Sequence, residues 1–123
     1  MSTETIRVLV VGAHPDDCDL KAGGVACKYA ERGHEVLFIS MTNGEAGHHE
    51  LAGRTLVERR RAEAEASAAV AGAEFDGFDI PDGRLQPSLE IRDQLIRRIR
   101  TFQPDLVLTH RPNDYHPDHR YTA

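Results

Sequence analysis

Cysteine is scarce in this sequence, and its scarcity excludes a fold held together by disulfide bonds. The 123 residues include two cysteines, Cys18 and Cys27, which lack the spacing of a CxxC pair. Small disulfide-bonded domains need more cysteines than this. We therefore expect both residues to be reduced thiols.

Long apolar runs are also missing. The first residues, Met1–Val11, carry a single early positive charge and a short apolar run before Gly12. That pattern matches neither a secretory signal peptide nor a membrane span. We expect a cytoplasmic protein that does not insert into a membrane.

Positive charge is the third deficit, since 15 lysines and arginines face 20 acidic residues and the net charge is −5. Nucleic acids and anionic membranes select for a basic face, so neither is expected as a partner. The most basic stretch, Glu58–Ala66, alternates in sign and is typical of a solvated helix face. The 40% of hydrophobic and 28% of charged residues are ordinary for a globular protein.

Apolar, β-branched segments alternate with helical patterns along the chain. Strands are predicted at Ile6–Val11, His34–Met41, Phe75–Ile80 and Asp105–His110, and helices at Asp19–Arg32, Arg54–Ala71 and Leu89–Phe102. The alternation predicts one Rossmann-like α/β domain over residues 1–123, with a mainly parallel sheet in the strand order 3-2-1-4. The loop after the first strand has one glycine, Gly12, where a dinucleotide-binding loop needs three.

Two clusters of histidine and aspartate follow the first and the fourth predicted strands. The first is His14, Asp16 and Asp17, and the second is His110, Asp114, His116, Asp118 and His119. In the predicted strand order these strands are neighbours, and ligands bind at the carboxyl ends of such strands. Ionisable groups crowded there repel or desolvate one another unless a cation lies between them. The clusters supply three zinc ligands with carboxylates to spare, so we predict a Zn²⁺ site with one position left for water.

Several motifs occur in a fixed order: AHPDD with Gly23 and Gly24, RGHEV, MTNGEAG, Arg60-x-x-Glu63, PDGRL and HPDHR. In these motifs the sequence resembles the zinc-dependent N-acetylglucosaminyl deacetylases of the PIG-L and LmbE type. The resemblance implies a hydrolase that removes an N-acetyl or other N-acyl group from a small glucosamine-like sugar or glycoconjugate. Asp19 stands where this family usually has a glutamate, which could alter contacts around the ligands.

The resemblance also implies roles for the two clusters. His14, Asp17 and His119 would hold the zinc ion, and Asp16 would be the general base. The chemistry agrees, because Asp17 on the metal leaves the neighbouring Asp16 free to take a proton from the attacking water.

His116 would stabilise the oxyanion or protonate the amine, and Asp118 would orient or tune His116. Arg60, Asn43 and Tyr115 are candidate substrate contacts, although Arg60 could instead brace the site or lie on the surface and Tyr115 could simply pack. The remaining histidines are expected to be structural or exposed: His34, His48, His49 and His110.

Two other functions compete with this one. His14-x-Asp16 with a distant histidine also matches the facial triad of non-haem iron oxygenases, but those enzymes commonly use β-rich barrels. A non-catalytic metal-binding or assembly module is the second rival, because the chain stops shortly after His119 while the resembled family continues. We expect a C-terminal portion to be lacking, and further polypeptide or another subunit, as in a homo-oligomer, to pack against the fourth strand and residues 113–123.

Overall fold

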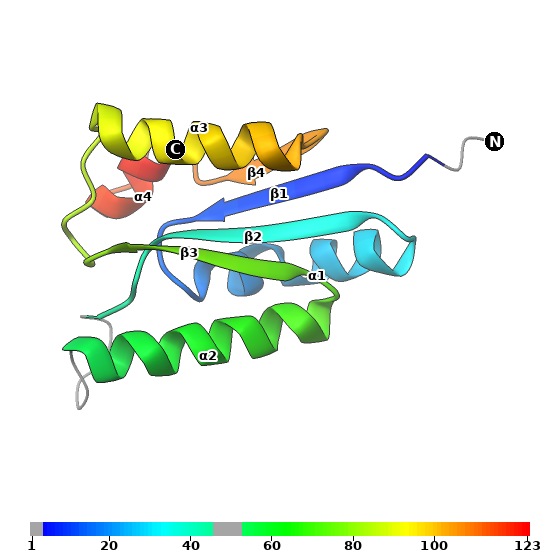
Figure 1. Cartoon of the computed structure of the whole chain (residues 1–123), viewed down its shortest axis with the longest axis horizontal. Helices are drawn as coiled ribbons and strands as arrows, with labels where there is room; N and C mark the ends of the chain where they lie inside the picture. Colours follow the sequence, from blue (N-terminus) through cyan, green and yellow to red (C-terminus); the bar gives the residue numbers. More distant parts are fainter. Residues whose placement is uncertain (1–3, 46–52) are drawn as a thin grey trace.

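The protein has three layers, with helices on both faces of a central sheet (Figure 1). The computed structural model describes residues 4–45 and 53–123. The elements are β1 (Arg7–Gly12), α1 (Asp17–Glu31), β2 (Glu35–Thr42), α2 (Gly53–Ala71), β3 (Glu74–Ile80), α3 (Leu89–Phe102), β4 (Leu106–Thr109) and α4 (Pro117–Thr122). The predicted strands and helices are confirmed to within two residues at each end, and α4 is an element that the sequence pattern did not predict.

The sheet is parallel, and its strand order is β3-β2-β1-β4, as predicted. The central strand β1 pairs with β2 on one side and with β4 on the other. In the β1–β4 register Val11 lies beside Thr109. The loop after β1 and the loop after β4 therefore start next to each other, although they are far apart in the sequence.

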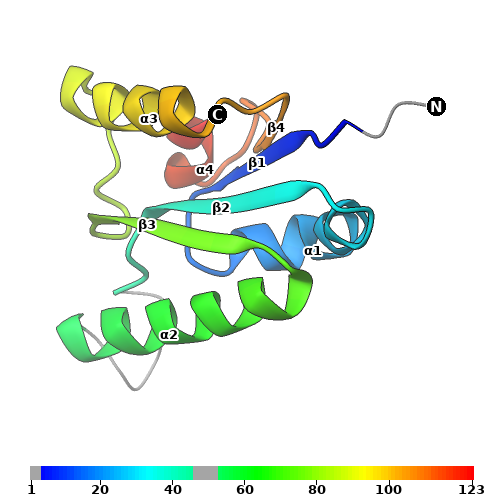
Figure 2. The ribbon, with the colours of Figure 1, turned by 45° about the vertical axis from the view of Figure 1, so that its right-hand side comes forward.

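Both faces of the central strands are buried, which explains their unbroken apolar runs. Val8 and Val10 pack with Phe38 against α1 and α2. Leu9 and Val11 point the other way and pack in the cluster that α3 covers. Figure 2 shows α1 and α2 below the sheet and α3 with α4 above it. This α/β architecture is not the β-rich barrel that an iron oxygenase would commonly use.

The short helix α4 begins in a way that fixes a functional side chain. His116 caps it, with Nδ1 accepting a hydrogen bond of 3.1 Å from the amide of Asp118. Pro117 occupies the first helical position, where its missing N–H costs nothing. Within the described ranges, no helix is long and apolar enough to cross a membrane.

Candidate metal centre and active site

The loop from β1 to α1 is held rigidly at the carboxyl end of the sheet. The Ala13 carbonyl accepts hydrogen bonds from the Thr42 amide and hydroxyl, at 2.8 and 2.7 Å. The Ala13 amide donates to Nε2 of His110 at 3.0 Å. A side chain at Gly12 would meet Cβ of Asp17 at 2.8 Å, so this glycine allows Asp17 to lie tightly against the end of β1. Thr42 of β2 and His110, the residue after β4, thus fix the loop from both sides.

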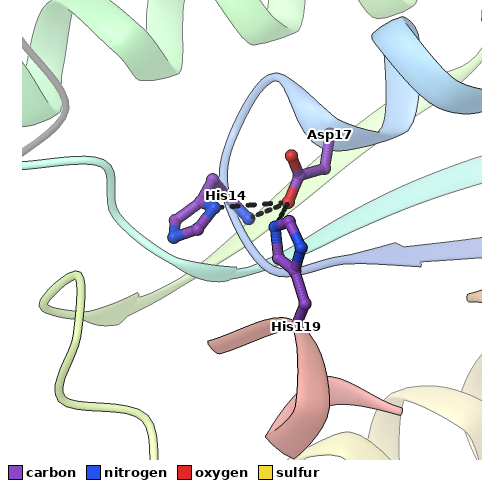
Figure 3. Close-up of side chains that lie close together, drawn as sticks. All are labelled: His14, Asp17 and His119. Atoms are coloured by element: carbon purple, nitrogen blue, oxygen red, sulfur yellow. Dashed lines mark hydrogen bonds and ion pairs between the residues drawn. The ribbon is translucent and has the colours of Figure 1, made fainter. Parts of the chain in front are cut away.

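His14, Asp17 and His119 converge on one point (Figure 3). Asp17 Oδ2 lies 3.4 Å from Nδ1 of His14 and 3.3 Å from Nε2 of His119. Ligands about 2.0–2.1 Å from a tetrahedral Zn²⁺ ion lie about 3.3 Å from one another. The spacing and the His₂Asp donor set therefore fit a zinc ion held by these three side chains.

Ion pairing between His14 and Asp17 stabilises this group without a metal ion. Burial opposes protonation of His14, but hydrogen bonds with Asp17 and Asp118 outweigh it and raise the pKa of His14 to about 9. Burial likewise opposes ionisation of Asp17, yet hydrogen bonds from the His14 side chain and amide bring the pKa of Asp17 well below its ordinary value. The metal-free site therefore holds an ionised aspartate facing a protonated histidine.

Each of the two histidines has a carboxylate on its second ring nitrogen. Asp118 Oδ2 lies 2.9 Å from Nε2 of His14, and Asp114 Oδ2 lies 3.3 Å from Nδ1 of His119. A carboxylate that accepts the remote N–H fixes which nitrogen presents its lone pair. The other ring nitrogen, Nδ1 in His14 and Nε2 in His119, is the one that faces Asp17.

A second group, His14, His116 and Asp118, also brings potential ligand atoms together. Its shortest contact is the 2.9 Å hydrogen bond between His14 and Asp118, a distance typical of hydrogen bonding. In the part of the chain that the structure describes, Asp118 contacts His116 through its backbone amide, and no ion pair joins the Asp118 carboxylate to the His116 ring. The predicted role of Asp118, to orient or tune His116, stays a prediction, and the contact between the two residues in the structure is this amide hydrogen bond.

A pocket of about 380 Å³ opens beside the metal group and is lined by His14, Asp16, Arg60, Asp82, Gly83, His116 and Asp118. Arg60 comes from α2 and donates to Asp16 Oδ1 and to the Gly44 carbonyl, both at 3.1 Å. The candidate base Asp16 therefore lines the same pocket as His116 and is held by an arginine from another helix.

Gly44 leaves the space through which the Arg60 side chain extends to Asp16. Its φ is +78°, and a Cβ atom there would come within 2.7 Å of Cδ and Nη1 of Arg60. Asp82 accepts from the Gly44 amide at 2.8 Å and from the Thr42 hydroxyl at 2.9 Å. The end of β2 is thereby tied to the loop that follows β3.

Two candidate substrate contacts lie outside this pocket. Asn43 is buried and donates to Asp79 Oδ1 at 3.0 Å, in a neighbouring cavity between α2 and β3. The Tyr115 side chain is 95% exposed. Of the histidines expected to be structural or exposed, His34 accepts from the Ile6 amide at 3.1 Å. The loop histidines lie outside the described residues: His48 and His49.

Sequence reasoning placed His110 and Asp114 in the second cluster but gave neither residue a role in the site. The His110 ring stacks on His119, with ring centroids 4.1 Å apart. Burial lowers the pKa of His110, and the nearby His119 adds to this effect, so its Nε2 stays available to the Ala13 amide. The adjacent positions of β1 and β4 are the signal that places His110 here.

The fold and the site define an α/β protein with a His₂Asp group, spaced as metal ligands are, at the carboxyl end of a parallel sheet. A family model, PIG-L (GlcNAc-PI de-N-acetylase), matches residues 9–123. The chain belongs to this family.

Relatives named for different reactions are similar to this chain. The diacetylchitobiose deacetylase of Thermococcus kodakarensis is 33% identical, over 95% of this chain and 46% of that protein. The 4-oxalmesaconate hydratase of Pseudomonas putida is 32% identical, over 97% of this chain and 49% of that protein. The structure of the N,N'-diacetylchitobiose deacetylase from Pyrococcus horikoshii superimposes with a TM-score of 0.89 at 36% identity, over 97% of this chain and 47% of that chain. The chain spans about half the length of these relatives.

Proposed function

We propose that the protein is a zinc-dependent N-deacetylase that removes an acetyl or other acyl group from the nitrogen of a small glucosamine-like sugar or glycoconjugate in the cytoplasm. The observation that carries the proposal is the His14–Asp17–His119 group beside Asp16 and His116 in one pocket. Family membership supports it, as do the deacetylases among the relatives.

His14, Asp17 and His119 would hold the ion, which when bound acidifies a water molecule and polarises the amide carbonyl. Asp16 accepts the proton of the attacking water while Arg60 holds the Asp16 carboxylate in place. As water oxygen bonds to the carbonyl carbon and the C–N bond breaks, that proton passes to the departing nitrogen. The products are the carboxylic acid and the free amine, which at neutral pH are present as the carboxylate and the ammonium ion.

His116 is suited to meeting the negative charge that develops on the carbonyl oxygen. Its Nδ1 accepts the Asp118 amide hydrogen, so the ring carries its proton on Nε2. A fixed N–H donor next to a developing oxyanion is the usual source of such stabilisation. His116 thus serves as a hydrogen-bond donor through Nε2.

A hydratase is the second candidate, because one relative of similar identity carries that name. Addition of water to a carbon–carbon double bond would use the same ion and base. Parallel assays with N,N'-diacetylchitobiose and with 4-oxalmesaconate separate the two reactions. We expect release of acetate from the first and no consumption of the second.

Zinc content tests the ligand set. We expect about one zinc ion per chain, because three converging ligands with an open fourth position are typical of catalytic zinc sites. His14→Ala and His119→Ala should each remove the metal, as measured by elemental analysis after gel filtration. Full zinc occupancy in both variants would show that these histidines are not the ligands.

Asp16→Asn separates metal binding from chemistry. The variant should keep its zinc ion and lose deacetylation by about the 10²–10⁴-fold that a general base contributes. His116→Ala should behave in the same way. If Asp16→Asn kept full turnover under conditions in which the unsubstituted protein is active, another residue would be the general base.

A further inference from the structure

Asp118 is the most deeply enclosed charged group of the site. It is fully buried, while its Oδ1 atom has no hydrogen-bond partner among the described residues. Burying a carboxylate is costly unless donors and an opposite charge compensate it. Among the described residues, the donors that compensate this carboxylate all contact Oδ2, so the surroundings of that atom indicate what the residue does.

Two donors from different segments meet at Asp118 Oδ2. The Gly83 amide, in the loop after β3, donates at 2.8 Å, and Nε2 of His14 lies at 2.9 Å. The Gly83 contact fixes where the carboxylate points. The carboxylate in turn fixes the His14 ring, whose side chain is 14% exposed.

We propose that Asp118 is a positioning residue for the metal ligand His14, which it holds in the tautomer that directs Nδ1 toward the ion. With Nε2–H donated to Asp118, Nδ1 is the nitrogen that faces Asp17 Oδ2, at 3.4 Å, and the one whose lone pair a bound ion would use. His116 contacts Asp118 only at the backbone amide among the described contacts. This inference rests on the proposed function, since it assumes that His14 binds the metal.

Asp114 offers an internal comparison. It faces the remote nitrogen of the other histidine, His119, at the longer distance of 3.3 Å and from a less enclosed position. We expect its loss to weaken metal binding less than the loss of Asp118.

The test measures zinc affinity by competition with a chromophoric chelator. Asp118→Ala should weaken zinc binding by about 10–100-fold, the usual effect of removing a carboxylate behind a ligating histidine. Thr122→Ala is the matched control, because Thr122 is a buried residue of the same helix that donates to the Asp118 carbonyl without touching its carboxylate. It should leave the affinity within about threefold of the unsubstituted protein.

A spectroscopic readout isolates the tautomer. In zinc-loaded protein labelled with ¹⁵N-histidine, the Nε2–H signal of His14, assigned by its absence in His14→Ala, should be present. It should persist in Thr122→Ala and vanish by exchange with water in Asp118→Ala. Asp118→Asn keeps the side-chain volume and one acceptor oxygen, so it should keep the Nε2–H signal and lose less zinc affinity than Asp118→Ala. It also replaces Asp118→Ala in the test if that variant does not fold.

Two outcomes would overturn the inference while the proposed function stands. If the Asp118 variants bind zinc as tightly as Thr122→Ala, the carboxylate does not position His14. If Asp118→Ala loses zinc as completely as His14→Ala, Asp118 is itself a ligand. Failure of the unsubstituted protein to bind zinc would instead remove the proposed function, and the inference with it.

Discussion

His14 uses both ring nitrogens, and this dual use makes metal binding depend on pH. A ligating histidine must be neutral, whereas the pKa of His14 in the metal-free protein is raised to about 9. Zinc must therefore displace a proton at neutral pH. We predict that the apparent zinc affinity rises about tenfold per pH unit between pH 7 and 9 and levels off above that range. Chelator competition at several pH values measures the slope, and a flat profile would contradict the prediction.

The same residue sets the pH dependence of stability without metal. A histidine whose pKa is raised by folding stabilises the fold fully below its unfolded pKa of 6.5 and loses that contribution as the pH rises through about 9. The free energy of unfolding of the metal-free protein should thus fall between these pH values. Urea titrations of His14→Gln provide the control, because this variant should lose that fall.

At the scale of elements, the contact between α2 and the loop after β2 depends on Gly44, which Arg60 of α2 touches. Gly44→Ala places an L-residue at φ +78° and drives its Cβ into Arg60. Gly33→Ala is the matched control, since Gly33 has φ +83° and open space around its Cβ. Each left-handed residue costs about 1–2 kcal/mol, so both variants should unfold at lower urea concentration.

Only Gly44→Ala should also impair turnover, because it displaces Arg60 from Asp16. Steady-state kinetics of the two variants decide the point. Equal activity in both would mean that the contact between Arg60 and Asp16 does not matter for the reaction.

The sequence predicts those elements whose burial produces a strong pattern. The strands β1 and β2 are covered on both faces and show unbroken apolar runs, and the order of the strands follows from the alternation with helices. The helix α4 has six residues, too few for a periodic pattern, and it is capped by His116 rather than by a residue common at that position. Its start at Pro117 was the one available signal.

The sequence likewise predicts some features of the site and not others. Neighbouring strand ends bring His14, Asp17 and His119 together once the strand order is known. The partner of Asp118 could not be read from spacing, because sequence adjacency points to His116. Only the placement of α4 against the loop at Gly83 turns that carboxylate toward His14.

At the scale of the whole molecule, β4 is a short strand at one edge of the sheet. Val107 on it is 46% exposed, and a cavity of about 230 Å³ lies between β4 and α1, with Val25 and Leu108 in its lining. Exposed sheet edges promote unwanted pairing, and proteins usually cover them. We predict that further polypeptide or another subunit covers β4 in the native protein.

Light scattering, intact mass and deacetylase assays test this prediction together. A chain of 13.7 kDa produced by itself should bind zinc and yet either self-associate or turn over substrate poorly. Hydrogen exchange at the β4 amides should be fast in the isolated chain. A monomer of that mass with full activity would contradict the prediction.

The pairing of β1 with β4 also governs when the protein can acquire its ion during folding. His14 and His119 are more than a hundred residues apart in the sequence, and only the β1–β4 register brings them together. Because contacts of such long range are slow to form, we expect them to close after the local helices and the β1–β2 pairing. An ion that binds only the fully paired sheet stabilises that state alone. We therefore expect zinc to stabilise the product of the last folding step, so that zinc uptake reports the completion of the sheet.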